Sequence, residues 1–163
     1  MTSHRWDKEN WIRTLAGATL NNGEWQAQDP ELVRKGALGV IQEIITELYD
    51  DARHAAAEFN QFCDPRRQVR VLALDARSEG FILMQARTQL RVVWTGGTLQ
   101  AHVTVSTGFT HRQIHSRTWS PKLDGLGGVW WQTEAVGSQL LAGSMIIKQL
   151  FEDLNRATLM FAT

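Results

Sequence analysis

The hydrophobic period of this chain changes near Gln68, and that change constrains the fold more than any other feature. Before it, apolar residues from Val33 to Phe62 recur at the three- and four-residue spacing of a helix. After it, apolar and polar residues alternate, which is typical of strands with one buried face. Because 163 residues is the length of one ordinary domain, we expect a single α+β domain over 1–163.

A long helix is expected over 29–63. Asp29 is a good capping residue, Pro30 suits the first helical position, and Glu31 places an acid in the first turn. Asp64-Pro65 ends the pattern, because proline disfavours helix for the residue before it. Such a helix would measure about 50 Å at 1.5 Å per residue and would overhang a strand. Part of it is therefore expected to meet another subunit or domain.

Two further helices are expected at the ends of the chain. Asp7 can cap a short helix that ends at Asn21-Asn22-Gly23, so residues 1–28 should hold a short helix and a turn. Thr133 can cap a C-terminal helix over 133–160, whose apolar stripe should lie on the sheet.

Residues 68–132 predict an antiparallel meander of five to six strands with both long helices on one face. Gly96-Gly97 is suited to a two-residue hairpin turn. That turn predicts a register in which Trp94 faces Leu99, Val92 faces Ala101 and Leu90 faces Val103. In the next hairpin, His102 should oppose Gln113 and Thr104 should oppose His111.

This register divides the strands between a core face and an open face. The expected core residues are Leu72, Leu74, Phe81, Leu83, Leu90, Val92, Trp94, Leu99, Ala101, Val103, Val105 and Ile114. The expected open-face residues are Val71, Ile82, Met84, Arg91, Val93, Gln100, His102, His111, Gln113, His115 and Arg117. One bulge would exchange the two faces along the rest of a strand.

Charge is segregated along the chain, although the total is zero. Residues 1–64 carry a net charge of −5, residues 65–123 carry +7, and residues 124–163 carry −2. Eight of the nine basic residues in the middle block are arginine, whose planar fork suits phosphate or carboxylate. Acidic helices and a basic sheet could instead neutralise one another within one chain or across a dimer.

The charge pattern favours a non-catalytic binding or regulatory module that engages an anionic partner: nucleic acid, an acidic protein surface or an anionic ligand. We expect it to act as a homodimer, because the overlong helix and the apolar residues of the open face would leave a large exposed patch. The expected binding residues are Arg91, His102, His111, His115 and Arg117.

Metal or cofactor binding is not indicated by the sequence. His111 and His115 have the spacing of zinc ligands on a helix, but on a strand that spacing separates them by about 13 Å. The single cysteine, Cys63, has no neighbouring histidine or thiol and suits a reducing compartment. We expect no metal site and no cofactor.

An alternative function is a small-ligand or enzymatic pocket between sheet and helices, gated by the loop over 120–128. Adjacent tryptophans follow this glycine-rich loop, and one of them should pack inward while the other points out. A stacking platform and a simple core anchor are both compatible with the pair. The expected pocket or loop residues are Trp119, Leu123, Leu126, Trp130 and Trp131.

No catalytic motif stands out, so we expect a binding protein rather than an enzyme. Gly125-Leu126-Gly127-Gly128 lacks the lysine and hydroxyl residue of a phosphate-binding loop. No apolar run reaches the roughly 18 residues that a membrane span needs. The start of the sequence has no signal-peptide character, so we expect a cytoplasmic protein.

Overall fold

A computed structural model describes residues 18–21, 24–27, 30–75, 79–123, 129–133 and 140–161, with side chains from residue 41 onward except Leu123. The fold is α+β: a long helix, a seven-stranded antiparallel meander curled into a half-barrel, and a second helix packed against the sheet. A separate two-stranded hairpin precedes them. The elements are β1 (Ala18–Asn21), β2 (Glu24–Ala27), α2 (Pro30–Phe62), the 3-10 turn η1 (Pro65–Arg67), β3 (Val69–Ala73), β4 (Gly80–Gln85), β5 (Thr88–Thr95), β6 (Thr98–Thr107), β7 (Thr110–Leu123), β8 (Val129–Thr133), β9 (Leu140–Leu141) and α3 (Gly143–Phe161).

Helix α2 begins and ends where the capping and proline signals predict. Asp64 caps the following η1 turn, because its side chain accepts a hydrogen bond from the backbone N–H of Arg66 at 2.8 Å. In the last turn of α2, the Asn60 side chain bonds both backbone groups of Val69, accepting from its N–H at 2.8 Å and donating to its carbonyl at 3.0 Å. The end of the helix is thereby fixed to the first residue of β3.

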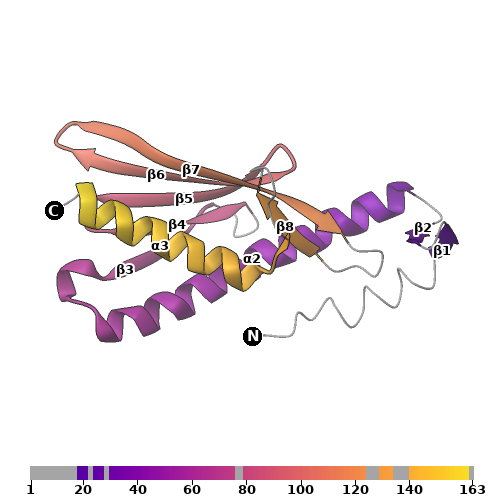
Figure 1. The fold of residues 1–163 in the computed structure, drawn as a ribbon, viewed down its shortest axis with the longest axis horizontal. Coiled ribbons are helices and arrows are strands. Elements are labelled where there is room, and N and C mark those ends of the chain that lie inside the picture. Colours follow the sequence, from indigo (N-terminus) through magenta and orange to yellow (C-terminus); the bar gives the residue numbers. More distant parts are fainter. Residues whose placement is uncertain are drawn as a thin grey trace.

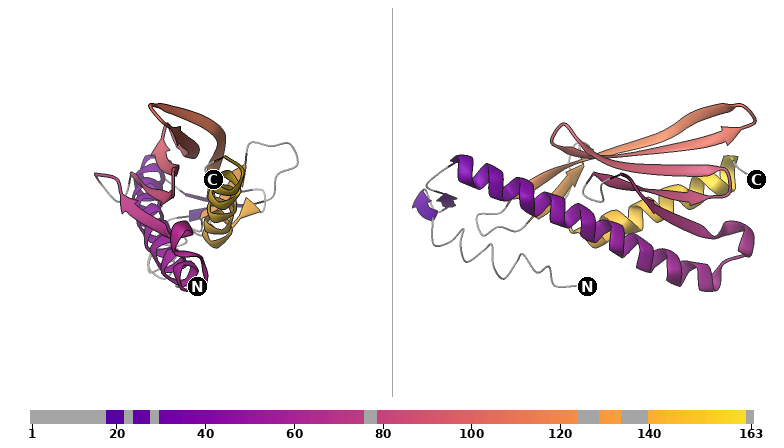
Figure 2. Two further views of the ribbon diagram at one scale, coloured as in Figure 1. Left: turned by 90° about the vertical axis from the view of Figure 1, so that its left-hand side faces the viewer. Right: turned by 180° about the vertical axis from the view of Figure 1, so that it is seen from behind.

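Both α2 and α3 lie on the concave face of the sheet (Figure 1 and Figure 2). Helix α2 runs beneath β3 and β4, whereas α3 lies beneath β4, β5 and β6. We call this helix-covered side the inner face and the opposite side the outer face. The core between them is aliphatic and aromatic, and its largest fully buried side chains are Trp119, Trp131, Phe81, Ile45, Leu48, Leu83, Leu90, Leu99, Ile146, Leu150 and Leu154.

The expected register of the β5–β6 hairpin is confirmed. Trp94 pairs with Leu99, Val92 with Ala101 and Leu90 with Val103. Gly96 and Gly97 form the turn with φ of 60° and 80°, a conformation that glycine adopts without strain.

The expected register of the β6–β7 hairpin is wrong. Thr104 pairs with Gln113 instead of His111, because the turn lies one residue further along at Gly108-Phe109. The register then shifts between Val103 and Thr104, since Val103 pairs with His115 and leaves Ile114 as the extra residue of a bulge. Every residue of β7 after Ile114 therefore lies on the face opposite to the one that was expected.

The face assigned to β3 is also reversed. Val71 pairs with Leu83, a fully buried residue, so Val71 is on the inner face. Leu72 pairs with Ile82 and lies on the outer face, where it is exposed. The segment around these residues is apolar at both parities, so alternation alone does not assign its faces.

The ends of the sheet differ from expectation in two further respects. The short helix expected at the start does not extend over Ala18–Asn21, which forms β1, and residues 1–17 lie outside the described part. The C-terminal helix begins at Gly143 rather than Thr133, because Thr133 is the last residue of β8 and Leu140–Leu141 form a seventh strand. Residues 134–139 lie outside the described part.

Candidate functional site

The outer face of the sheet is the first candidate surface, because neither described helix covers it (Figure 2). Cross-strand pairing assigns its cationic residues. Arg91 pairs with His102, Arg70 pairs with Met84, and Lys122 pairs with Trp130. These side chains therefore lie on one surface formed by β3 to β8.

Carboxylates are absent from the strands that form this surface. None of the seven strands of this sheet, β3 to β9, contains an aspartate or glutamate. The two acids of the basic middle block, Asp75 and Glu79, both lie in the connection between β3 and β4. The cations of the outer face consequently have no acidic neighbour within the sheet.

His102 is the least satisfied polar side chain of the outer face. It sits directly opposite Arg91, and its Nδ1 is buried without a hydrogen-bond partner among the described residues. Arg91 is exposed. An unpaired buried polar atom is costly in the free protein, whereas the guanidinium opposite it is accessible to a partner.

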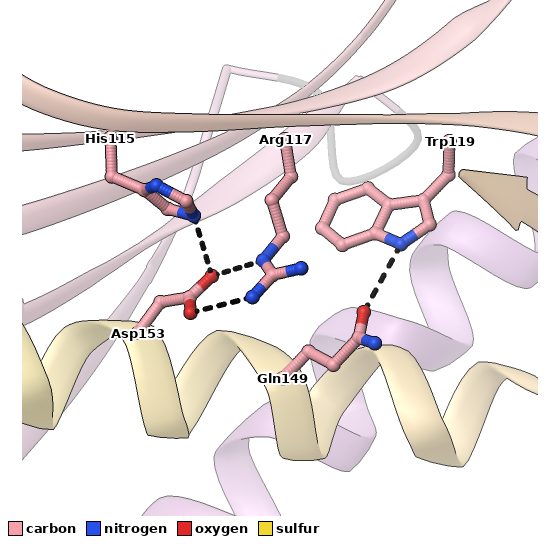
Figure 3. Close-up of polar contacts among 5 residues, drawn as sticks. All are labelled: His115, Arg117, Trp119, Gln149 and Asp153. Carbon is pink, nitrogen blue, oxygen red and sulfur yellow. Dashed lines mark hydrogen bonds and ion pairs between the residues drawn. The ribbon is translucent and has the colours of Figure 1, made fainter. Parts of the chain in front are cut away.

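The inner face carries a second polar cluster, formed by His115 and Arg117 of β7 with Asp153 of α3 (Figure 3). Arg117 donates two hydrogen bonds to Asp153, from Nε to Oδ2 at 2.5 Å and from Nη2 to Oδ1 at 3.0 Å. His115 Nε2 lies 3.4 Å from the same Oδ2. The side chain of Asp153 is 3% exposed, compared with 29% for Arg117 and 45% for His115.

This cluster is a bidentate ion pair that holds α3 to β7. The hydrogen bonds to Asp153 raise the pKa of the Arg117 guanidinium above its ordinary value, against the opposing effect of burial. The guanidinium is therefore charged at every pH below the ordinary arginine pKa. The forked guanidinium bonds both oxygens of the buried Asp153 carboxylate. The side chain of Arg117 is therefore held by α3.

Trp119 and Trp131 are core residues rather than components of an open pocket. Trp119 is fully buried, and its Nε1 donates to Oε1 of Gln149 at 3.3 Å (Figure 3). Trp131 is also buried and meets the ring of Trp94 edge-on, with centroids 6.2 Å apart. Trp130 points outward and is exposed, so the two adjacent tryptophans lie on opposite faces as predicted.

The predicted loop begins later than expected, because residues 120–123 belong to β7. Leu126 lies outside the described residues, and Leu123 is the last residue of β7 with no side chain described. The hypothesis of a pocket gated by 120–128 therefore stays a prediction.

The five residues expected to bind an anion do not form one patch. Arg91 and His102 are brought together on the outer face. His111 pairs with Ser106 near the tip of the β6–β7 hairpin, also on the outer side. His115 and Arg117 lie on the inner face with Asp153, because the Ile114 bulge reverses their orientation.

Arg70 of the outer face and Asp153 of the inner-face cluster were not among the site residues predicted from the sequence. Arg70 becomes an outer-face residue once β3 takes its observed register. Asp153 stands next to Leu154 and three residues after Leu150, on the buried stripe of α3. A carboxylate at a buried stripe position requires a cationic partner, and that signal was available in the sequence.

No protein-family model, curated protein or solved structure matches this chain. Within the described ranges, no group of three or more histidine, cysteine, aspartate or glutamate side chains is placed to hold a metal ion. The assignment of function therefore depends on the two faces of the sheet.

Proposed function

We propose that this protein is a non-catalytic binding module whose outer sheet face engages an acidic protein surface. The observation that carries the proposal is the uncovered outer face, with Arg70, Arg91 and Lys122 on strands that contain no carboxylate. Uncompensated cations on an open face attract anionic partners and speed their association. The inner-face cations do not contribute, because Asp153 neutralises Arg117.

Apolar side chains between the cations favour a protein partner over nucleic acid. Leu72, Ile82, Met84 and Val93 lie on the outer face among the arginines, with Leu72 exposed and the others half-buried. Arginine and methionine are enriched at protein interfaces. Proteins that bind single strands need aromatic platforms, and Trp130 is the single aromatic residue among the described outer-face positions.

The same charge argues against two outer faces packing on each other. Face-to-face association would bring Arg70 and Arg91 of both copies together without a carboxylate between them, which disfavours that pairing. The homodimer expected from the sequence stays a prediction. We expect its interface to lie on α2 instead of the outer face. Sedimentation should therefore give a dimer that survives Arg70→Gln/Arg91→Gln; a monomer at tens of micromolar contradicts the dimer.

The test of the proposed function is binding of a fluorescein-labelled poly-glutamate peptide, measured by anisotropy at low and physiological salt. The Arg70→Gln/Arg91→Gln variant should bind at least about tenfold more weakly than the wild type, and binding should fall as salt screens the charges. Arg87→Gln/Arg112→Gln is the matched control, because it removes two exposed arginines at the ends of strands instead.

Three results would overturn the proposal. One is no binding of the peptide at low salt. Another is an equal loss in the two double variants, which would indicate non-specific attraction. The third is binding of a single-stranded DNA oligonucleotide, but not of the peptide, through Arg70 and Arg91.

A further inference from the structure

One end of the molecule gathers exposed apolar side chains that neither the core nor the outer face uses. We call it the apolar end and define it by the last residue of α2, the tip of the β6–β7 hairpin and the last three residues of α3. These residues are Phe62, Phe109, Leu159, Met160 and Phe161, and all five are exposed.

Hydrogen bonds between distant segments connect the chain near this end of the molecule. Gln85 Nε2 donates to the carbonyl of Arg67 at 2.7 Å and to Asn155 Oδ1 at 2.9 Å. The backbone N–H of Ser106 donates to the carbonyl of Arg87 at 3.0 Å. In Figures 1 and 2, the hairpin tip, the end of α2 with η1 and the C-terminal end of α3 lie at the same end of the molecule.

The exposure of this end is unusual for the type of residue involved. Phe109 is 105% exposed at the two-residue turn Gly108-Phe109, and Phe62 is 83% exposed. The burial of α3 stops at Thr158, and the three apolar residues that follow are exposed. Turn tips and helix ends are normally polar, and clustered exposed apolar residues mark interaction sites.

Arginines accompany these apolar side chains along the chain. The segments at this end (Figure 1) are 62–69, 85–88, 105–112 and 155–161, and together they contain five arginines and one carboxylate. Arg66, Arg87, Arg112 and Arg156 are exposed, and Asp64, the one carboxylate, is engaged in capping η1. A surface that combines projecting apolar tips with a cationic rim complements a bilayer with anionic headgroups.

We propose that the apolar end docks on the surface of an anionic lipid bilayer, with Phe109 entering the headgroup region and the arginines contacting lipid phosphates and carboxylates. The apolar side chains come from three separate segments, two helix ends and one hairpin tip, which suits a deformable lipid surface better than a shaped protein pocket. No described helix has the length and apolar character of a membrane span, so the contact is peripheral. The proposal is independent of the outer face, which lies on the flank of the molecule.

Flotation with vesicles tests this inference. Wild-type protein should float with phosphatidylcholine vesicles that contain about 30% phosphatidylserine and should remain behind with pure phosphatidylcholine. Phe109→Ser should reduce the bound fraction about tenfold, because an apolar side chain no longer leaves water on binding. Met145→Ser is the matched control, since Met145 is exposed at the other end of α3, and it should bind as the wild type does.

A matched pair of double variants tests the contribution of charge to vesicle binding. Arg87→Gln/Arg112→Gln should weaken binding about tenfold, whereas Arg70→Gln/Arg91→Gln on the outer face should leave it unchanged. All four substituted arginines are exposed, so circular dichroism and melting should be the same for both variants and the wild type.

Three outcomes would overturn the proposal. The first is a wild-type protein that does not float with the anionic vesicles at low salt. The second is undiminished binding by Phe109→Ser, and the third is loss of binding through Arg70 and Arg91 instead. Peptide binding by the outer face is measured without lipid, so failure of either proposal is seen separately from failure of the other.

Discussion

The inner and outer faces of the β5–β7 region each present an arginine and a histidine, and the two pairs have opposite roles. On the outer face, Arg91 and His102 sit opposite each other without a carboxylate. On the inner face, Arg117 and His115 surround the buried Asp153. One extra residue, Ile114, separates these arrangements. Identical residue types therefore form either an uncompensated cationic surface, which we propose binds a partner, or a structural ion pair, according to strand register.

The largest expected effect is the loss of stability on removal of Trp119, a buried tryptophan of the inner face. Trp119→Ala should lower the free energy of unfolding by about 3 to 5 kcal/mol, because it removes a fully buried ring and leaves a cavity. Trp130→Ala, on the exposed side of the neighbouring strand, should change it by less than about 1 kcal/mol. Urea denaturation of both variants measures the difference, and equal losses would mean that the faces of β7 and β8 are misassigned.

The next effect concerns the ion pair between β7 and α3. Arg117→Ala should lower the free energy of unfolding by about 2 to 3 kcal/mol, because Asp153 is left buried with only the half-exposed His115 nearby. Arg117→Lys should recover only part of this loss, since lysine cannot make two parallel bonds to one carboxylate.

Removing both partners isolates their coupling. A double-mutant cycle with Arg117→Ala and Asp153→Ala should give a coupling energy of about 1 to 3 kcal/mol, with the double variant less destabilised than the sum of the single variants. Additive effects would show that the two side chains do not interact in solution.

The smallest expected effect is that of His115. Its Nε2 is 3.4 Å from Asp153 and its side chain is almost half exposed. His115→Ala should therefore cost less than about 1 kcal/mol at neutral pH by the same denaturation measurement. A larger loss than that of Arg117→Ala would reverse the order of importance within the cluster.

The elements of the fold were predictable because periodicity and turn chemistry are local. The helical stripe up to Phe62 and the proline after Asp64 located α2 within a residue of its observed limits. The Gly96-Gly97 turn determined the β5–β6 register, since a two-residue hairpin leaves one way to pair the strands.

The faces of β3 and β7 were not predictable, because alternation does not distinguish them. Val71 and Leu72 are both apolar, so either can face the core. The bulge at Ile114 lies in a run of polar residues, where no apolar pattern signals that the register has shifted. The partner of Arg117 is 36 residues away on α3, and only the tertiary fold brings Asp153 to it.

The most direct test of the division between the faces measures stability and peptide binding on the same two variants. Arg91→Ala should weaken binding of the poly-glutamate peptide and change the free energy of unfolding by less than about 0.5 kcal/mol. Arg117→Ala, at a temperature where it is fully folded, should bind the peptide as the wild type does, despite its loss of stability. The account is contradicted if Arg117→Ala loses peptide binding while its unfolding free energy is unchanged.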